Sequence, residues 1–322
     1  MCALFGWLDY KHIIPNKILK KLTQALANAA EERGTDAAGI SYVRDGKVVI
    51  FKRPKPAHKI RFNAPESTTA VMGHTRLTTQ GNQKFNQNNH PFYGHTDKKF
   101  AFAHNGVLYN DEELRKEKSL PVTNIETDSY VAVQLIEQQK KLNFDSLKSM
   151  AETVQGNFNF TLLDEENSLY IIKGSNPMFL LHFEELGLYI YASTESIMKN
   201  ALKKVSMQNF PYTKIKTTHG DIIKIDYRGL LSRSEFENKE FDLTSWYRCS
   251  CNYEDDYYTQ HEQLLFDICN TFGVVKEDVI LLLDYGYSSD EIEDMLMDCD
   301  LLQSTIQNIK YQNYYNDFLM EI

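Results

Sequence analysis

The sequence lacks the features that mark secreted, membrane-spanning and disulfide-stabilised chains. No charged amino-terminal segment is followed by an apolar run, so we expect no secretory leader. No apolar stretch approaches the ~18–20 residues that a membrane-spanning helix needs. The five cysteines are an odd number without a regular spacing: Cys2, Cys249, Cys251, Cys269 and Cys299. We therefore predict a cytoplasmic protein with reduced cysteines and no membrane partner.

Basic residues are nearly missing from the carboxy-terminal part of the chain. Residues 251–322 hold 16 acidic residues and only two basic ones, a balance of −14, whereas residues 1–250 carry +5. This asymmetry predicts two modules. Phosphate groups would be repelled by the acidic part, so we expect no nucleic-acid partner.

The cysteines of the acidic part suggest zinc as one interpretation. Cys249, Cys251, His261, Cys269 and Cys299 could supply ligands, but their spacings match no common zinc site. We therefore favour buried helical cysteines and predict neither a metal nor a cofactor.

The residues that are present predict a large packed core and an α+β fold. Apolar residues make up 42% of the chain and aromatic residues 12%. Hydrophobic periodicity predicts strands in blocks with helices between the blocks, which indicates stacked antiparallel sheets flanked by helices. The expected helices are 16–30, 127–141, 145–154 and 194–203. The expected strands are the opening run, 39–43, 47–52, 70–76, 100–104, 157–163, 168–173, 178–183, 187–192 and further strands to about 234.

The domain boundaries follow from the same pattern. We predict a first domain at residues 2–235, a linker at 236–260 and an acidic, all-helical module at 261–322. Within that module the expected helices are 261–272, 276–284, 288–298 and 301–319. Its apolar positions predict a small core, and its charge predicts a docking surface for a partner with a basic face.

Cys2 is the first candidate for chemistry. If Met1 is removed, Cys2 carries a free α-amine, which titrates near pH ~7.7–8.0 and lies beside the thiol. One residue could then supply both the nucleophile and the base that activates it. Taken alone, a cysteine at position 2 is more often an accident.

Five further stretches place polar residues where predicted strands and helices end. They are residues 32–39 (Glu-Arg-Gly-Thr-Asp-Ala-Ala-Gly), 73–81 (Gly-His-Thr-Arg-Leu-Thr-Thr-Gln-Gly), 88–91 (Asn-Asn-His-Pro), 104–106 (His-Asn-Gly) and 126–129 (Glu-Thr-Asp-Ser). With Cys2, their order and spacing resemble the class II glutamine amidotransferases, which are N-terminal-nucleophile glutaminases. Glucosamine-6-phosphate synthase and amidophosphoribosyltransferase contain such domains. The resemblance covers about residues 2–235 and implies a four-layer αββα sandwich.

The resemblance also implies a role for each matched residue. Cys2 would attack the γ-amide carbon of glutamine, and Asn105 and Gly106 would donate hydrogen bonds to the oxyanion. Arg76 would bind the substrate α-carboxylate and Asp128 the α-ammonium, while Thr79 and His90 would line the pocket. The residues expected to support the site are Arg33, Gly34 and Asp36. Without the resemblance, Asn105-Gly106 would be interpreted as a tight turn, Arg76 as a surface ion pair and Asp128 as a helix N-cap.

Two departures from the family leave the reaction partner open. Leu77 stands where glucosamine-type members have tryptophan, which weakens the case for coupling of that type. Only about 80 residues follow the matched region, so we expect a separate ammonia-accepting enzyme. Two alternatives stay open: hydrolysis of another γ-glutamyl amide, and a regulatory protein that senses glutamine.

Overall fold

The computed structural model describes residues 2–237, 260–285, 287, 289–296, 302–307 and 309–310. It divides into two compact units, Met1–Phe241 and Asp242–Ile322. Within these described ranges, no helix is both long and apolar enough to cross a membrane.

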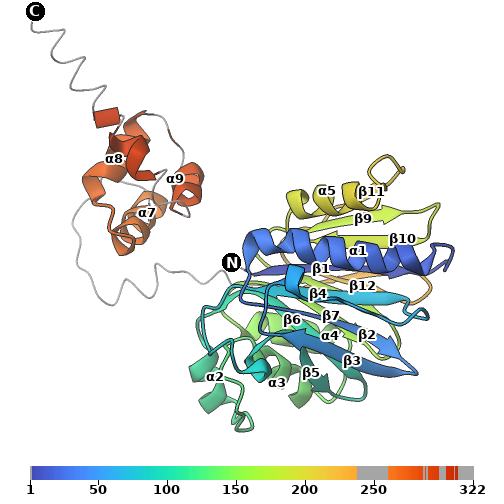
Figure 1. Cartoon of the computed structure of the whole chain (residues 1–322). Coiled ribbons are helices and arrows are strands. Elements are labelled where there is room, and N and C mark those ends of the chain that lie inside the picture. Colours follow the sequence, from blue (N-terminus) through green and yellow to red (C-terminus); the bar gives the residue numbers. More distant parts are fainter. Residues whose placement is uncertain are drawn as a thin grey trace, which may run out of the picture. The chain divides into compact units, whose positions relative to one another are not determined.

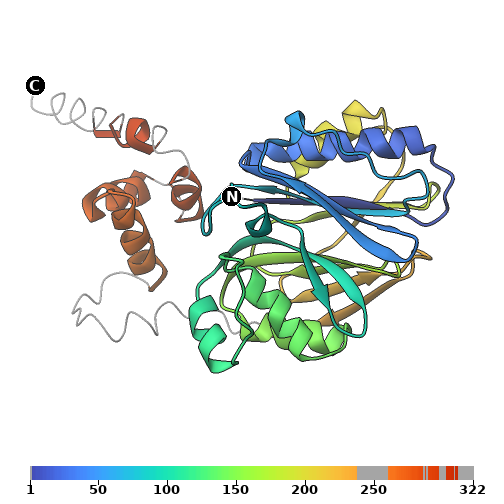
Figure 2. The same ribbon diagram turned by 60° about the horizontal axis from the view of Figure 1, so that its bottom comes forward.

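The first unit has four layers, helix–sheet–sheet–helix. Helices α1 (Asn16–Ala29) and α5 (Glu195–Lys204) cover one sheet. Helices α3 (Tyr130–Gln138) and α4 (Phe144–Thr153) lie on the opposite side of the molecule against the other sheet. Figure 1 labels these elements, and Figure 2 shows the layers nearly edge-on; they form the α+β architecture predicted from the sequence.

Both sheets are antiparallel throughout. The first has the order β11-β9-β10-β1-β4-β2-β3, and the second has the order β13-β12-β8-β7-β6-β5. The strands of the first sheet are β1 (Ala3–Asp9), β2 (Ala37–Arg44), β3 (Lys47–Arg53), β4 (Ala70–Arg76), β9 (Phe179–Phe183), β10 (Leu188–Ala192) and β11 (Thr213–Ile215). The strands of the second are β5 (Phe92–His95), β6 (Lys99–Leu108), β7 (Gly156–Asp164), β8 (Leu169–Lys173), β12 (Asp221–Ile225) and β13 (Leu231–Glu235).

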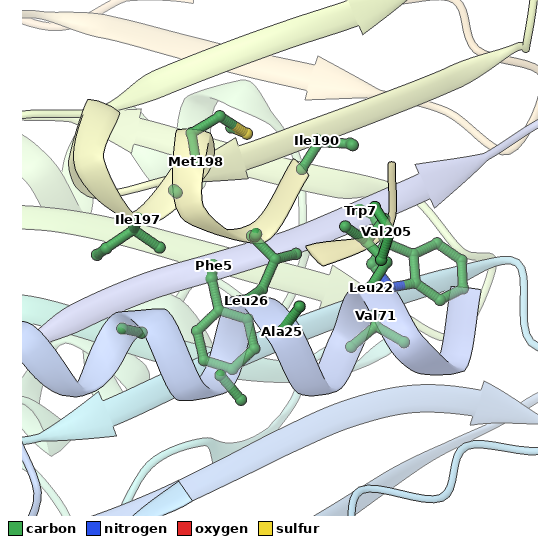
Figure 3. Packing of buried hydrophobic residues seen from close by; sticks show 14 of the residues in the cluster. Phe5, Trp7, Leu22, Ala25, Leu26, Val71, Ile190, Ile197, Met198 and Val205 are labelled. Carbon is green, nitrogen blue, oxygen red and sulfur yellow. The ribbon is translucent and has the colours of Figure 1, made fainter. Parts of the chain in front are cut away.

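Strand β1 forms the centre of the first sheet, and all seven of its residues are buried. Because side chains alternate along a strand, Phe5 and Trp7 pack under the helical layer while Leu4 and Leu8 pack between the sheets. Figure 3 shows Phe5 and Trp7 beside α1, among side chains from α5 and neighbouring strands. Trp7 Nε1 also donates to Thr23 Oγ1 at 2.8 Å. The strand that follows Cys2 is therefore held firmly in the core.

Several predicted elements have different limits in the structure. Asn105 and Gly106 do not follow their strand but lie inside β6, because pairing with β7 continues to Leu108. The helix expected at 127–141 begins only at Tyr130. Helix α1 ends at Ala29, one residue before the predicted limit, and Pro15 occupies its N-cap. Strand β5 and helix α2 (Asp111–Glu117) were not predicted.

The second unit is built around helices α7 (Gln260–Thr271), α8 (Lys276–Tyr285) and α9 (Ser289–Met295). Residues 302–307 are also helical. These segments share one apolar cluster, which includes Leu265, Cys269, Leu282, Ile292 and Ile306. Residues 311–319 of the last predicted helix lie outside the described residues. The predicted domain limits, and the all-helical assignment of the whole module, stay predictions.

Candidate active site

Cys2 immediately precedes β1 and is half-buried. The adjacent residue Ala3 pairs with Thr75 of β4, so the thiol lies beside the end of β4. Sγ donates to the carbonyl oxygen of Leu77 at 3.4 Å. Burial raises the pKa of the Cys2 thiol, although the positive charge of Arg76 opposes this effect. The thiol is therefore protonated at neutral pH and needs a base before it can act as a nucleophile.

The segment from Arg33 to Asp36 holds the ends of β1 and β4 together. It follows the short 3₁₀ helix η1 (Ala30–Arg33) at the end of α1. Arg33 Nε donates to the carbonyl oxygen of Cys2 at 2.9 Å. The amide of Asp36 donates to the Arg76 carbonyl at 2.9 Å, and Asp36 Oδ2 accepts from the Thr78 amide at 2.8 Å. At Gly34 a Cβ would overlap the backbone of Arg76, so only glycine permits this approach.

Arg76 ends β4, and the residue is only 3% exposed. It donates to Asn89 Oδ1 at 2.7 Å and to the carbonyl oxygens of Gln80 and Gly81 at 2.5 and 3.2 Å. These contacts with described residues use three of its five N–H groups and leave two for a ligand. Arg76 also interacts electrostatically with Cys2 and Asp128. The loop after β4 therefore fixes a cation close to the thiol.

The same loop carries Thr79, which is exposed. Leu77 is 43% exposed, and the thiol contacts its carbonyl rather than its side chain. Thr79 is two residues from Leu77, whose carbonyl the thiol contacts, and its place in a glutamine pocket stays a prediction.

Asp128 is buried and interacts electrostatically with the same thiol. Its Oδ2 accepts from the Leu108 amide at 2.7 Å, and its Oδ1 accepts from Ser129 Oγ at 3.3 Å. The alternative role of Asp128 as a helix N-cap is wrong, because Ser129 occupies the N-cap of α3 and no side chain caps that helix. The Cys2 thiol therefore interacts electrostatically with one cation, Arg76, and one anion, Asp128.

Asn105 and Gly106 lie on β6 of the other sheet. The Asn105 carbonyl accepts from Asn176 Nδ2 at 2.9 Å, which holds the backbone at this point. Gly106 has φ of +143°, and a Cβ there would overlap the carbonyl oxygen of Asn157. An L side chain rarely adopts this backbone conformation, so glycine is required at position 106.

His90 lies in the interior rather than on an open surface. Its ring centroid is 4.2 Å from that of His74 and 4.3 Å from that of Phe92. Burial lowers the pKa of His90 well below its usual value and that of His74 to about 3. Both rings are therefore neutral at pH 7. This position favours a structural part for His90, and its contribution to the pocket stays a prediction.

Three further residues of the site were not found from the sequence. Asn89 orients Arg76 through its side chain, while Lys52 Nζ donates to the carbonyl oxygens of Asn89 and Pro91. Ser193 Oγ lies between Leu4 N and Asn105 Nδ2, at 2.8 and 3.4 Å. Asn89 lies within the matched stretch 88–91, so its position in the sequence could have indicated a role at the site. Lys52 is half-buried within an otherwise ordinary hairpin, and only the fold brings Ser193 to the site.

The described part of the chain contains no group of three or more His, Cys, Asp or Glu side chains placed to hold a metal ion. Cys249, Cys251 and Cys299 lie outside the described residues, so the prediction about zinc is not tested at those positions.

Comparisons with known proteins bear on this geometry. Residues 74–200 match the family described as "Glutamine amidotransferase domain". Glutamine–fructose-6-phosphate aminotransferase of Staphylococcus epidermidis is 32% identical over 189 residues, and that of Bacillus cereus is 34% identical over 191. Each alignment spans 56% of this chain and 30% of the relative, so the match covers less than a third of these curated proteins.

Solved structures show the same fold. Glutamine phosphoribosylpyrophosphate amidotransferase from B. subtilis superposes with a TM-score of 0.57 at 20% identity, covering 73% of this chain and 49% of that one. A structure titled as the allosteric regulatory enzyme of purine biosynthesis gives 0.58 at 19% identity, with coverage of 74% and 50%. The chain carries a class II glutamine amidotransferase domain with the fold of N-terminal-nucleophile hydrolases. The amidotransferase domain and the α+β fold predicted for the first unit are thus confirmed.

Proposed function

We propose that the first unit hydrolyses the side-chain amide of glutamine through a thioester on Cys2 and releases ammonia to a separate acceptor enzyme. The observation that carries this proposal is the charge arrangement around the thiol. Arg76 and Asp128 both interact with Cys2, and free glutamine has one carboxylate and one ammonium group at its α-carbon. A fixed cation and a fixed anion suit that head group and would leave the γ-amide to reach the thiol.

The reaction would take place in two steps. The Cys2 sulfur bonds to the carbonyl carbon of the side-chain amide, the C–N bond at that carbon breaks after the nitrogen accepts a proton, and ammonia leaves. Water then adds to the thioester carbon, which releases glutamate and restores the thiol. Each step passes through an oxyanion, for which we assign the Asn105 amide and the Gly106 backbone N–H as donors.

The base in this proposal is the α-amine of Cys2. Burial raises the pKa of the thiol, so a nearby proton acceptor is needed, and an α-amine titrates close to neutral pH. The proposal therefore requires that Met1 be removed.

The acceptor and the acidic module belong to the same proposal. We propose that the acceptor enzyme is a separate polypeptide in the cytoplasm and that residues 261–322 dock a partner with a basic face. The balance of −14 over residues 251–322 supports this choice, since opposite charge speeds encounter and makes it dependent on salt.

The decisive experiment measures ammonia and glutamate released from glutamine by the purified chain. Cys2→Ala should abolish release and leave the thermal midpoint nearly unchanged. Cys269→Ala, the matched cysteine variant in the second unit, should keep full activity. Turnover of γ-glutamyl-methylamide but not glutamine would favour the other amide hydrolase, and binding of glutamine without turnover would favour a sensor.

A further inference from the structure

Ser193 is a buried residue that links the two sheets next to the candidate active site. It follows β10 directly and is 0% exposed. Its amide donates to the Leu4 carbonyl at 2.9 Å, and its Oγ accepts from the Leu4 amide at 2.8 Å. Leu4 is two residues after Cys2. The hydroxyl of Ser193 therefore has a fixed position relative to the strand that carries the thiol.

The same hydroxyl lies 3.4 Å from the side-chain nitrogen of Asn105. In that orientation of the amide, Ser193 Oγ accepts two hydrogen bonds, and its own proton has no acceptor among the described residues. Asn105 Oδ1 is also buried and without a described partner. The Ser193 hydroxyl proton thus lacks an acceptor and the neighbouring Asn105 Oδ1 lacks a donor, so the two groups could form a hydrogen bond with each other.

Rotating the Asn105 amide by 180° about its last side-chain bond exchanges oxygen and nitrogen in nearly the same space. The Ser193 hydroxyl can then donate to Asn105 Oδ1 while it still accepts from Leu4. Two unsatisfied atoms become one hydrogen bond. The Asn105 NH₂ group moves to the buried place that has no described partner, where it is a free donor.

We propose that Ser193 is a positioning residue for the oxyanion hole. Its hydroxyl donates to Asn105 Oδ1 and so keeps the Asn105 NH₂ group free for the oxyanion. This inference rests on the proposed function, because it presumes that Asn105 donates to a tetrahedral intermediate. It explains why the donor is preorganised: without a fixed acceptor for its oxygen, the amide could rotate and present oxygen to a negative charge. The bridge from Leu4 to Asn105 also fixes the donor relative to the nucleophile strand.

Kinetics in a double-mutant cycle separate positioning from simple packing. Ser193→Ala should lower kcat for glutamine by about tenfold or more and change KM by less than about threefold, because Asn105 is needed mainly in the transition state. In an Asn105→Ala background, Ser193→Ala should change kcat by less than about twofold, since there is no amide left to orient. Ser41→Ala, a buried serine of β2, is the control and should leave kcat unchanged. Equal effects of Ser193→Ala in both backgrounds would overturn the inference.

Neutron diffraction from crystals of the deuterated protein gives a test that does not depend on turnover. Nitrogen, oxygen and deuterium scatter neutrons differently, so the amide orientation can be observed directly. We expect deuterium on Ser193 Oγ directed at the oxygen of Asn105. Deuterium on the Asn105 nitrogen directed at Ser193 would overturn the inference, even if Ser193→Ala unfolds the protein. If the expected orientation is found in a protein that does not hydrolyse glutamine, the hydrogen bond stands and the proposed function fails.

Discussion

At the scale of single residues, the Cys2 thiol lies in surroundings that keep its proton. Burial raises its pKa, and its hydrogen bond runs toward the carbonyl of Leu77. Arg76 cannot accept that proton, and the hydrogen bond of the thiol runs to Leu77 rather than to Asp128, whose oxygens accept from the Leu108 amide and from Ser129. The α-amine of a processed amino terminus is therefore the base that best fits this site.

The first prediction tests that base. Inserting one glycine between Met1 and Cys2 keeps the thiol but moves the α-amine to the added residue. We expect kcat for glutamine to fall ~10²–10⁴-fold, the usual contribution of a positioned base. Intact-mass measurement of the unmodified chain should show loss of one methionine. Full activity in the inserted variant, or in a chain that retains Met1, would contradict the proposal.

The second prediction concerns Arg76. Lysine keeps the positive charge but loses the planar fork that binds a carboxylate and holds the loop. Arg76→Lys should raise KM ~10–100-fold, the equivalent of one lost charge-assisted hydrogen bond. The value of kcat should change less. Steady-state kinetics with glutamine measure both, and a thermal midpoint close to that of the parent chain excludes a folding defect. A fall in kcat with KM unchanged would mean that Arg76 does not hold the substrate.

At the scale of elements, most strands were predicted from the sequence, but the extension of β6 through Asn105 and Gly106 was not. The strands expected at 39–43 and 47–52 were predicted correctly as β2 and β3, because alternating residues on both sides of the turn residues Asp45 and Gly46 are a local pattern. Asn105-Gly106 was expected to follow its strand, since those residue types are typical of turns. Pairing with β7 overrides that local preference. Ser193 could not be found, because only the packing of the two sheets brings it to Asn105.

The third prediction compares two glycines with positive φ. A Cβ at Gly106 would overlap the Asn157 carbonyl, whereas a Cβ at Gly46 has no neighbour within 4 Å. Gly46→Ala should therefore cost about 1–2 kcal/mol of unfolding free energy from backbone strain alone. Gly106→Ala should cost at least ~3 kcal/mol, because atoms must also move. Urea unfolding measures both values, and equal losses would show that the strand can adapt at position 106.

The fourth prediction concerns three buried histidines, which lie on β4, on β6 and in the loop before β5. Burial lowers the pKa values of His74, His90 and His104, so below pH 6.5 the unfolded chain binds more protons than the folded one. The free energy of unfolding should fall as the pH drops through this range toward about 3, the pKa of His74. Each histidine contributes at most ~1.4 kcal/mol per pH unit. Nearby Arg76 and Lys52 add to the shift at His90.

The variant His90→Phe tests this dependence. Neither ring nitrogen of His90 has a partner among the described residues, so phenylalanine should preserve the packing against His74 and Phe92 at pH 7. Urea unfolding at several values between pH 7 and 4 should give a slope reduced by up to ~1.4 kcal/mol per pH unit. An unchanged slope in the His90 variant would contradict the prediction.

At the scale of the whole molecule, each unit has apolar clusters of its own. Among the residues that the structure describes, the three clusters of the first unit extend to Phe236 and the cluster of the second unit begins at Leu265. All matched site residues lie in the first unit, between Cys2 and Asp128. None of the described contacts of the site involves the acidic module at residues 261–322, which is consistent with a separate function for that module.

The fifth prediction follows from that division. A chain shortened to end at Phe241 should fold, because its clusters remain complete, and its kcat/KM for glutamine should stay within about threefold of the full chain, as expected for independent sites. The acidic module is proposed to recruit the acceptor enzyme, so the shortened chain should lose salt-dependent association with that enzyme once it is known. The measurements are thermal unfolding, glutaminase kinetics and association at two salt concentrations.

If the module instead covers the glutamine pocket or apolar surface of the first unit, truncation will give insoluble protein or a large fall in kcat/KM. Either result would overturn the assignment of the module to docking.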